Sequence, residues 1–147
     1  MKQLIILLLL ATLSFSAFAQ FPLGSKVADI KSYFAQNIPY ASIQEFKTKA
    51  GENGICFTKV KVVGDYTFYF DNDGHCSSYV VTYDENELQD LIVRFDVKFC
   101  RMQETQWVAH DETFDVMLVP PKPGENFFSI VYKPKSTNVL TNAFAAN

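Results

Sequence analysis

Three cysteines and two histidines are the side chains of this sequence best suited to nucleophilic or metal chemistry: Cys56, Cys76, Cys100, His75 and His110. A cysteine thiolate is a nucleophile and a metal ligand, and an imidazole beside it can take the thiol proton. His75 and Cys76 are neighbours in a predicted strand, so their side chains point to opposite faces. A Cys–His pair therefore needs His110 with Cys76 or Cys100, and Asp111 could orient the imidazole. A hydrolase or a metal site built on such a pair is the least favoured hypothesis for this chain, because with so few Cys and His residues coincidence explains the pattern adequately.

The cysteine spacing contains no Cys-x-x-Cys pair, so neither a thioredoxin-like redox site nor a zinc knuckle is predicted. Two alternatives remain open. One is a single disulfide among Cys56, Cys76 and Cys100 that leaves one thiol over. The other is three free thiols buried as small apolar groups. No metal site and no cofactor is predicted.

The segment Asp71–Asn72–Asp73–Gly74 has the composition of a calcium loop. Aligning Gly74 with the invariant glycine of such a loop puts Tyr69 at the first ligand position and Val80 at the last, where carboxylates are required. We therefore predict a hairpin turn here, with Gly74 at a positive φ.

The core faces of the predicted strands do not have room for all of four aromatic residues: Tyr69, Tyr79, Tyr83 and Trp107. Exposed aromatic rings on a sheet can stack on sugars or anchor a protein partner. Tyr and Trp are also ordinary strand residues, which favours a structural role. Tyr69, Tyr79 and Trp107 are candidate binding residues on this basis.

The composition predicts one globular domain. The chain has 147 residues, of which 48% are hydrophobic and 20% charged, and its formal net charge is -3. Disorder needs low hydrophobicity with high net charge, and nucleic-acid binding draws on an excess of Lys and Arg. Both classes are therefore disfavoured.

Residues 1–19 are predicted to be a signal peptide. Lys2 precedes the apolar stretch from Leu4 to Leu13, and the small residues Ala17 and Ala19 suit a signal peptidase. An uncleaved anchor is the alternative, but a spanning helix needs about 20 apolar residues. No cysteine follows the cleavage site to accept a lipid. We expect a soluble periplasmic or extracellular protein without a stable membrane anchor, with one domain over 20–134 and a loosely held tail over 135–147.

Two helices are predicted. Ser25 caps the first, whose apolar row is Val27, Ile30 and Phe34 and which ends near Asn37. Asp84 and Glu87 form a capping-box pattern at the start of the second helix. One apolar stripe of the second helix is expected to face the sheet: Leu88, Leu91, Ile92, Phe95, Phe99 and Met102.

The opposite side of the second helix carries Val93, Val97 and Cys100, where a helix covered on one face has polar residues. Two explanations are open. Either the first helix or tail residues Val139, Leu140 and Phe144 cover this side, or it contacts a protein partner or a second copy in a homodimer.

The remaining segments predict an antiparallel sheet. Strands are expected over 55–63, 66–70 and 75–83, in a segment containing Trp107, and over 114–118 and 128–132. Residues 40–49 fit an edge strand or a helical turn. The face assignment expected for the first hairpin puts these residues on the core side: Cys56, Thr58, Val60, Val62, Tyr66, Phe68 and Phe70. It leaves Lys59, Lys61, Thr67 and Tyr69 outside. The fold class is α+β, with two main helices on an antiparallel sheet, and the element order indicates two αβββ-like halves.

The sequence resembles the small secreted uncharacterised proteins common in Bacteroidetes. The residues that carry this resemblance are Leu23, Gly24, Ser25, Val27, Ile30, Tyr66, Phe68, Phe70, Gly74 and Cys76. The helix-then-strands order is also similar to β-lactamase-inhibitor-like modules and to small outer-membrane-assembly lipoproteins. The resemblance implies a non-catalytic extracytoplasmic module and assigns no functional residues.

The favoured hypothesis is an exported binding module that is protein-binding or inhibitor-like. It predicts that the Val93, Val97, Cys100 stripe or an aromatic sheet face is exposed. The alternative is carbohydrate or small-ligand binding, which predicts a concave site with aligned rings. The Cys/His hypothesis predicts a cysteine sulfur within hydrogen-bond reach of His110.

Overall fold

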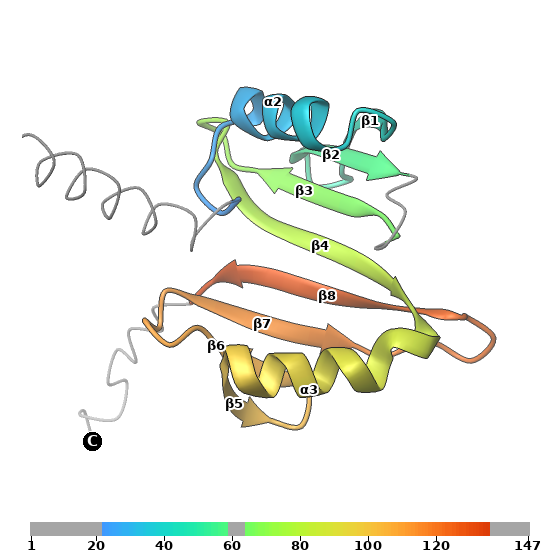
Figure 1. The fold of residues 1–147 in the computed structure, drawn as a ribbon. Coiled ribbons are helices and arrows are strands. Elements are labelled where there is room, and N and C mark those ends of the chain that lie inside the picture. Colours follow the sequence, from blue (N-terminus) through green and yellow to red (C-terminus); the bar gives the residue numbers. More distant parts are fainter. Residues whose placement is uncertain (1–21, 59–63, 136–147) are drawn as a thin grey trace, which may run out of the picture.

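The computed structural model describes residues 22–58 and 64–135, which form an α+β fold with one eight-stranded antiparallel sheet (Figure 1). The first elements in the chain are α2 (Val27–Asn37), β1 (Ser42–Lys47), β2 (Asn53–Thr58), β3 (Tyr66–Phe70) and β4 (Cys76–Asp84). They are followed by the 3₁₀ turn η1 (Glu85–Glu87), α3 (Leu88–Lys98), β5 (Cys100–Gln103), β6 (Gln106–Val108), β7 (Phe114–Val119) and β8 (Phe127–Pro134). The strand order is β1-β2-β3-β4-β8-β7-β6-β5. The long strands β4 and β8 therefore form the centre, and β1 and β5 form the edges.

Both helices cover the same face of the sheet. Residues directly opposite each other in neighbouring strands share a face, and one such row runs Ile55, Phe68, Tyr79, Tyr132, Val116 and Trp107. At one end of this row, Ile30 and Phe34 of α2 join the core with Ile55 and Phe68. At the other end, Leu91 and Phe95 of α3 join it with Val116 and Trp107. Figure 1 accordingly shows α2 against the β1–β3 end and α3 against the β5–β8 end.

The face assignment predicted for β2 is wrong by one residue. Ile55 and Phe57 are buried with Phe68 on the helix-covered side, whereas Cys56 lies opposite Thr67 on the other side. Both alternating sets of β2 have strand-forming residues, and burial favours the set with the larger apolar side chains. Val60, Val62, Lys59 and Lys61 lie outside the described residues.

The second predicted helix is confirmed, but it ends earlier than expected. α3 stops at Lys98, Phe99 has an extended backbone, and Cys100 and Met102 belong to strand β5. The spacing of apolar residues suggested a longer helix because Phe99, although its backbone is extended, still packs in the core. Met102 does not reach it, and its side chain is 68% exposed.

Local signals place the other elements. Asp84 caps the start of this region as predicted, since its Oδ1 accepts a hydrogen bond from the backbone N–H of Asn86, although the first turn there is η1. Asp71 Oδ1 accepts from the N–H groups of Asp73 and His75 and closes the predicted hairpin turn, in which Gly74 has φ +77°.

Residues 40–49, for which the sequence allowed either an edge strand or a helical turn, contain the edge strand β1. The predicted signal peptide and residues 136–147, which include Val139, Leu140 and Phe144, lie outside the described residues. In the part of the chain that is described, neither helix has the length and apolar character needed to cross a bilayer.

Candidate binding surface

No described helix covers the sheet face opposite α2 and α3, and we call this surface the open face. Its central positions come from β3, β4, β8 and β7: Thr67, Tyr69, Ser78, Val80, Thr82, Ser129, Val131, Lys133, Asp115, Met117 and Val119. All of them are half-buried except Val119, which is exposed. The sheet thus has one face in the core and one open to its surroundings.

The open face carries little charge. Among its central positions, only Asp115 and Lys133 are charged, and they lie directly opposite each other in β7 and β8. The rest of the central surface consists of Ser, Thr, Val, Met and Tyr side chains. A solvated sheet face usually carries polar residues, and exposed apolar side chains that lie together often mark an interaction site.

Tyr69 is the one predicted aromatic binding residue that lies on the open face. Its ring is half-buried and contacts the Phe46 ring edge to face, with 5.9 Å between centroids. Phe46 in turn lies over Gly54 of β2. These two rings form a small aromatic corner beside the β1 edge.

Tyr79 lies on the helix-covered face instead. Its ring stacks on Tyr132 with centroids 4.4 Å apart, and these two rings join the cores beneath α2 and α3. Burial raises the pKa of both phenols, and it raises the pKa of neighbouring Tyr83 to about 12. The three hydroxyls therefore remain neutral near pH 7.

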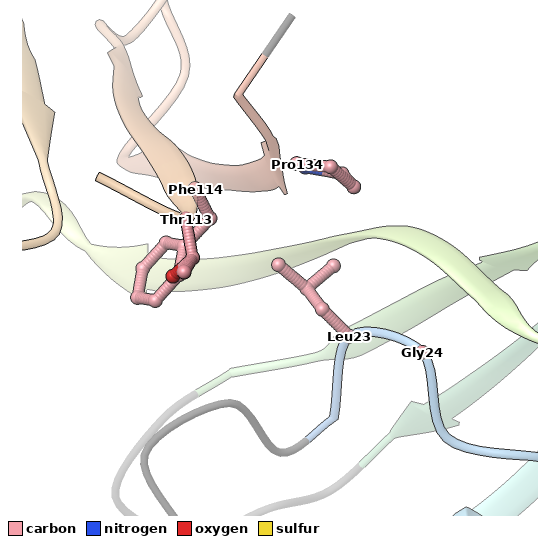
Figure 2. Close-up of a pocket in the computed structure, with 5 residues that line it drawn as sticks. All are labelled: Leu23, Gly24, Thr113, Phe114 and Pro134. Atoms are coloured by element: carbon pink, nitrogen blue, oxygen red, sulfur yellow. The ribbon is translucent and has the colours of Figure 1, made fainter. Parts of the chain in front are cut away.

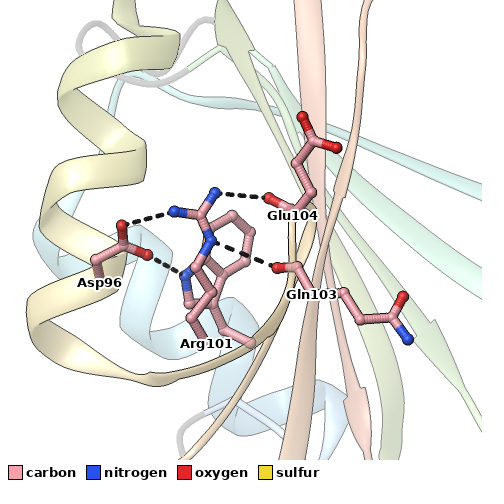
Figure 3. A network of polar contacts seen from close by, with 5 residues as sticks. Asp96, Arg101, Gln103 and Glu104 are labelled. Carbon is pink, nitrogen blue, oxygen red and sulfur yellow. Dashed lines mark hydrogen bonds and ion pairs between the residues drawn. The ribbon is translucent and has the colours of Figure 1, made fainter.

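Trp107 is a core residue, which contradicts the prediction that it binds a ligand. Its side chain is 1% exposed, and its Nε1–H donates to Asp96 Oδ1 at 2.7 Å. Asp96 Oδ2 accepts from Arg101 Nη1 at 2.9 Å, while Arg101 also donates to the backbone carbonyls of Gln103 and Glu104 (Figure 3). This network ties the last turn of α3 to β5 and β6.

The predicted stripe of Val93, Val97 and Cys100 is not one surface. Val93 and Val97 lie on the outer side of α3 with 64% and 81% of their side chains exposed, so α2 does not cover them. Cys100 pairs with Val108 in the sheet, and that register places it on the open-face side, away from α3. Since α3 ends before Cys100, the helical spacing that suggested the stripe does not extend to it.

All three cysteines are free thiols, so the predicted alternative of a disulfide among them is not realised. Cys76 is buried on the helix-covered side, and burial raises the pKa of its thiol to about 12. Cys56 is half-buried on the open face, where Thr67 Oγ1 donates to its sulfur at 3.5 Å. Cys100 is exposed, and its Sγ lies 3.1 Å from His110 Nδ1.

The Cys100–His110 contact has the distance that the Cys/His hypothesis required, but the third group expected for a hydrolase is engaged elsewhere. Asp111 Oδ1 accepts hydrogen bonds from the hydroxyl and the backbone N–H of Thr113, and these bonds lower the pKa of the carboxyl. In the described residues no three His, Cys, Asp or Glu side chains gather as metal ligands.

Two cavities are lined by neither the cysteines nor His110. The larger, about 270 Å³, opens between the chain before α2 and the β7–β8 end of the sheet (Figure 2) and is lined by Leu23, Gly24, Thr113, Phe114 and Pro134. The smaller, about 160 Å³, lies beside α2 at Phe34, Ile38, Ile43 and Phe57. Neither contains aligned tyrosine or tryptophan rings of the kind that a sugar site uses.

Comparisons of the chain with known protein families, curated proteins and solved structures found no match. Any functional conclusion therefore rests on the geometry of the chain itself.

Proposed function

We propose that this protein is an exported, non-catalytic module that binds another protein through the open face. The observation that carries the proposal is a broad, half-buried sheet surface whose central described positions include only two charged residues, Asp115 and Lys133, on the face opposite the two helices. A protein partner can cover such a surface without stripping water from many charges, which is costly when a charge is left unpaired.

The dimensions of the sheet support a protein partner. Eight strands spaced about 4.8 Å apart, with about six residues each rising about 3.3 Å, span roughly 750 Å². A stable interface takes about 600–1,000 Å² from each partner. The open face is therefore large enough for one folded protein, and larger than a small ligand needs.

The side chains of the open face also suit binding. Val80, Val131 and Thr67 are β-branched and held in a paired sheet, so they lose little conformational freedom when a partner covers them. Met117 adds an adaptable apolar side chain to the same row.

The order of elements supports two similar halves. A helix followed by four strands occurs twice, and the last strands of the two sets, β4 and β8, pair at the centre. Each half then has one strand more than the αβββ unit expected from the sequence. In this proposal the two halves form one continuous binding surface, and export follows from the N-terminal signal sequence.

Carbohydrate binding is less favoured, because Tyr79 and Trp107 are engaged in the core and only Tyr69 lies on the open face. The outer side of α3, with Val93 and Val97, is the competing protein-binding surface. The experiment must therefore distinguish the two surfaces.

Site-specific photocrosslinking in the cells that produce the protein makes this distinction. A photoreactive residue is placed at Val131 on the open face, at Val97 on α3, or at exposed Ser32 on α2 as a control. We expect one discrete heterologous adduct from position 131 that Val80→Lys abolishes, and none from position 32. A discrete adduct from position 97 alone, or equal adducts from positions 131 and 32, would overturn the proposal.

A further inference from the structure

Cys100 and His110 form a nucleophilic pair that the binding role does not use. We propose that Cys100 is a thiol–disulfide exchange site, in which His110 takes the thiol proton and the sulfur reacts with a disulfide. The proposal stands independently of what the open face binds.

The pair is held by the sheet edge. Cys100 is the first residue of β5 and lies directly opposite Val108 of β6, and His110 follows Val108 by two residues. His110 lies in the turn after β6, where the Ala109 N–H donates to the Phe114 carbonyl and the Glu112 N–H donates to the Ala109 carbonyl. There its imidazole lies beside the sulfur, with 3.1 Å between Sγ and Nδ1. The contact therefore joins the first residue of the β5–β6 pairing to a hydrogen-bonded turn.

Access distinguishes this thiol from the other two. β5 is an edge strand whose four residues are all exposed, and both Cys100 and His110 are exposed to solvent. Cys76 is buried with the core residues of α2, and Cys56 is half-buried, with its sulfur accepting a hydrogen bond from Thr67 Oγ1. The same molecule thus contains two internal references for a reactive cysteine.

The reaction balances without a further oxidant. The Cys100 S–H proton passes to unprotonated Nδ1 of His110 as the sulfur attacks one sulfur of a disulfide R–S–S–R. A Cys100–S–S–R bond forms and the original S–S bond breaks. The leaving R–S⁻ takes the proton from the imidazolium, so one thiol is released for each thiol consumed.

The substrate is a disulfide that is accessible at the molecular surface, either a low-molecular-weight one or one involving a second copy. No cavity is needed, because a small disulfide can approach the unpaired side of β5 along the line of the S–S bond. The first copy to be oxidised can likewise exchange with Cys100 of another molecule.

The rate of reaction with the aromatic disulfide DTNB tests the role of the pair. At pH 7 the native protein should show one fast thiol, and Cys100→Ser should remove that phase. His110→Gln should slow it about 10-fold, because an unassisted thiol is only a few per cent thiolate at this pH. His75→Gln, at the other histidine, serves as the matched control and should leave the rate unchanged. Circular dichroism confirms that each variant is folded.

Intact mass after incubation with oxidised glutathione identifies the source of the disulfide. A monomer carrying one glutathionyl group at Cys100 supports the small-molecule source, and a Cys100-linked dimer supports the second copy. The proposal fails if Cys100 forms neither product, or if folded His110→Gln reacts as fast as the native protein.

Discussion

Asp96 links α3 to the sheet through its two carboxylate oxygens. One accepts from the buried Trp107 indole and the other from Arg101, whose guanidinium lies 5.4 Å from the Trp107 ring centroid. A charged acceptor strengthens the indole bond, and removing it leaves a buried N–H without a partner. Trp107 thus has a structural role, and its indole N–H is bonded within the fold.

We expect Asp96→Ala to lower the free energy of unfolding by about 1–3 kcal/mol, the range for a lost hydrogen bond to a charged group. Urea denaturation measures the change. Gln89→Ala, at an exposed position of the same helix, should change it by less than about 0.5 kcal/mol. Equal effects of the two substitutions would show that the Asp96 network does not stabilise the fold.

Burial of Cys76 and Tyr83 should make the fold sensitive to alkali. Both groups have a folded pKa of about 12, above the ordinary values of 9.0 and 10.0 that apply in the unfolded chain. Between these values the unfolded chain has released protons that the folded chain keeps, so the free energy of unfolding falls as pH rises. The contribution is complete below about pH 9 and is lost toward pH 12.

Urea denaturation at pH 8 and pH 11 checks this expectation. The native protein should be less stable at pH 11, and Cys76→Ala and Tyr83→Phe should each reduce the difference between the two conditions. Leu91→Val, a core substitution without a titrating group, should lower stability at both pH values and leave the difference unchanged. A difference that neither titrating variant reduces would rule out these two residues as its origin.

At the scale of elements, the pairing of edge strand β1 depends on the close approach of Phe46 to Gly54. A side-chain carbon added at Gly54 would overlap the Phe46 ring, which lies across the neighbouring strand. An aromatic residue over a cross-strand glycine fixes register at a sheet edge. The same ring contacts Tyr69 and so shapes one corner of the open face.

Gly54→Ala should displace the Phe46 ring and weaken β1, at a cost of about 1–3 kcal/mol. We expect faster amide hydrogen exchange in residues 42–47 and little change in β8. Ser42→Ala, an exposed change in the same strand, is the control and should leave exchange unaltered. If amide exchange in β1 is the same in Gly54→Ala as in the native protein, the Phe46 ring moves aside without destabilising the strand.

Sequence patterns predicted the elements better than their ends and faces. Asp84 marked the start of the α3 region because its side chain caps the first turn there. The end of α3 was missed because no Gly or Pro stops the helix and Phe99 stays buried after the backbone becomes extended. The β2 faces were exchanged because Cys56 and Thr58 are as compatible with a strand as Ile55 and Phe57.

At the scale of the whole molecule, the open face exists only because distant segments pair. Thr67, Val80, Val131 and Met117 form one row through three strand pairings. No local pattern could reveal that β8 returns to lie beside β4. Tyr69 was therefore the only central residue of this surface that the sequence predicted as a binding residue. The Cys100–His110 contact was foreseen as a possibility from residue types, but its geometry likewise depends on the β5–β6 pairing.

Hydroxyl-radical footprinting tests the central claim, that the open face is the surface covered by a partner. Two methionines serve as native probes, since Met117 lies on the open face and Met102 on the exposed edge strand β5. Oxidation is compared between the purified protein and the protein in the cell fraction or medium where it accumulates. We predict protection of Met117 and Tyr69 with Met102 unprotected. Oxidation of Met117 and Tyr69 as fast as in the purified protein, while Met102 is protected, would contradict the account and assign binding to the β5 edge of the sheet.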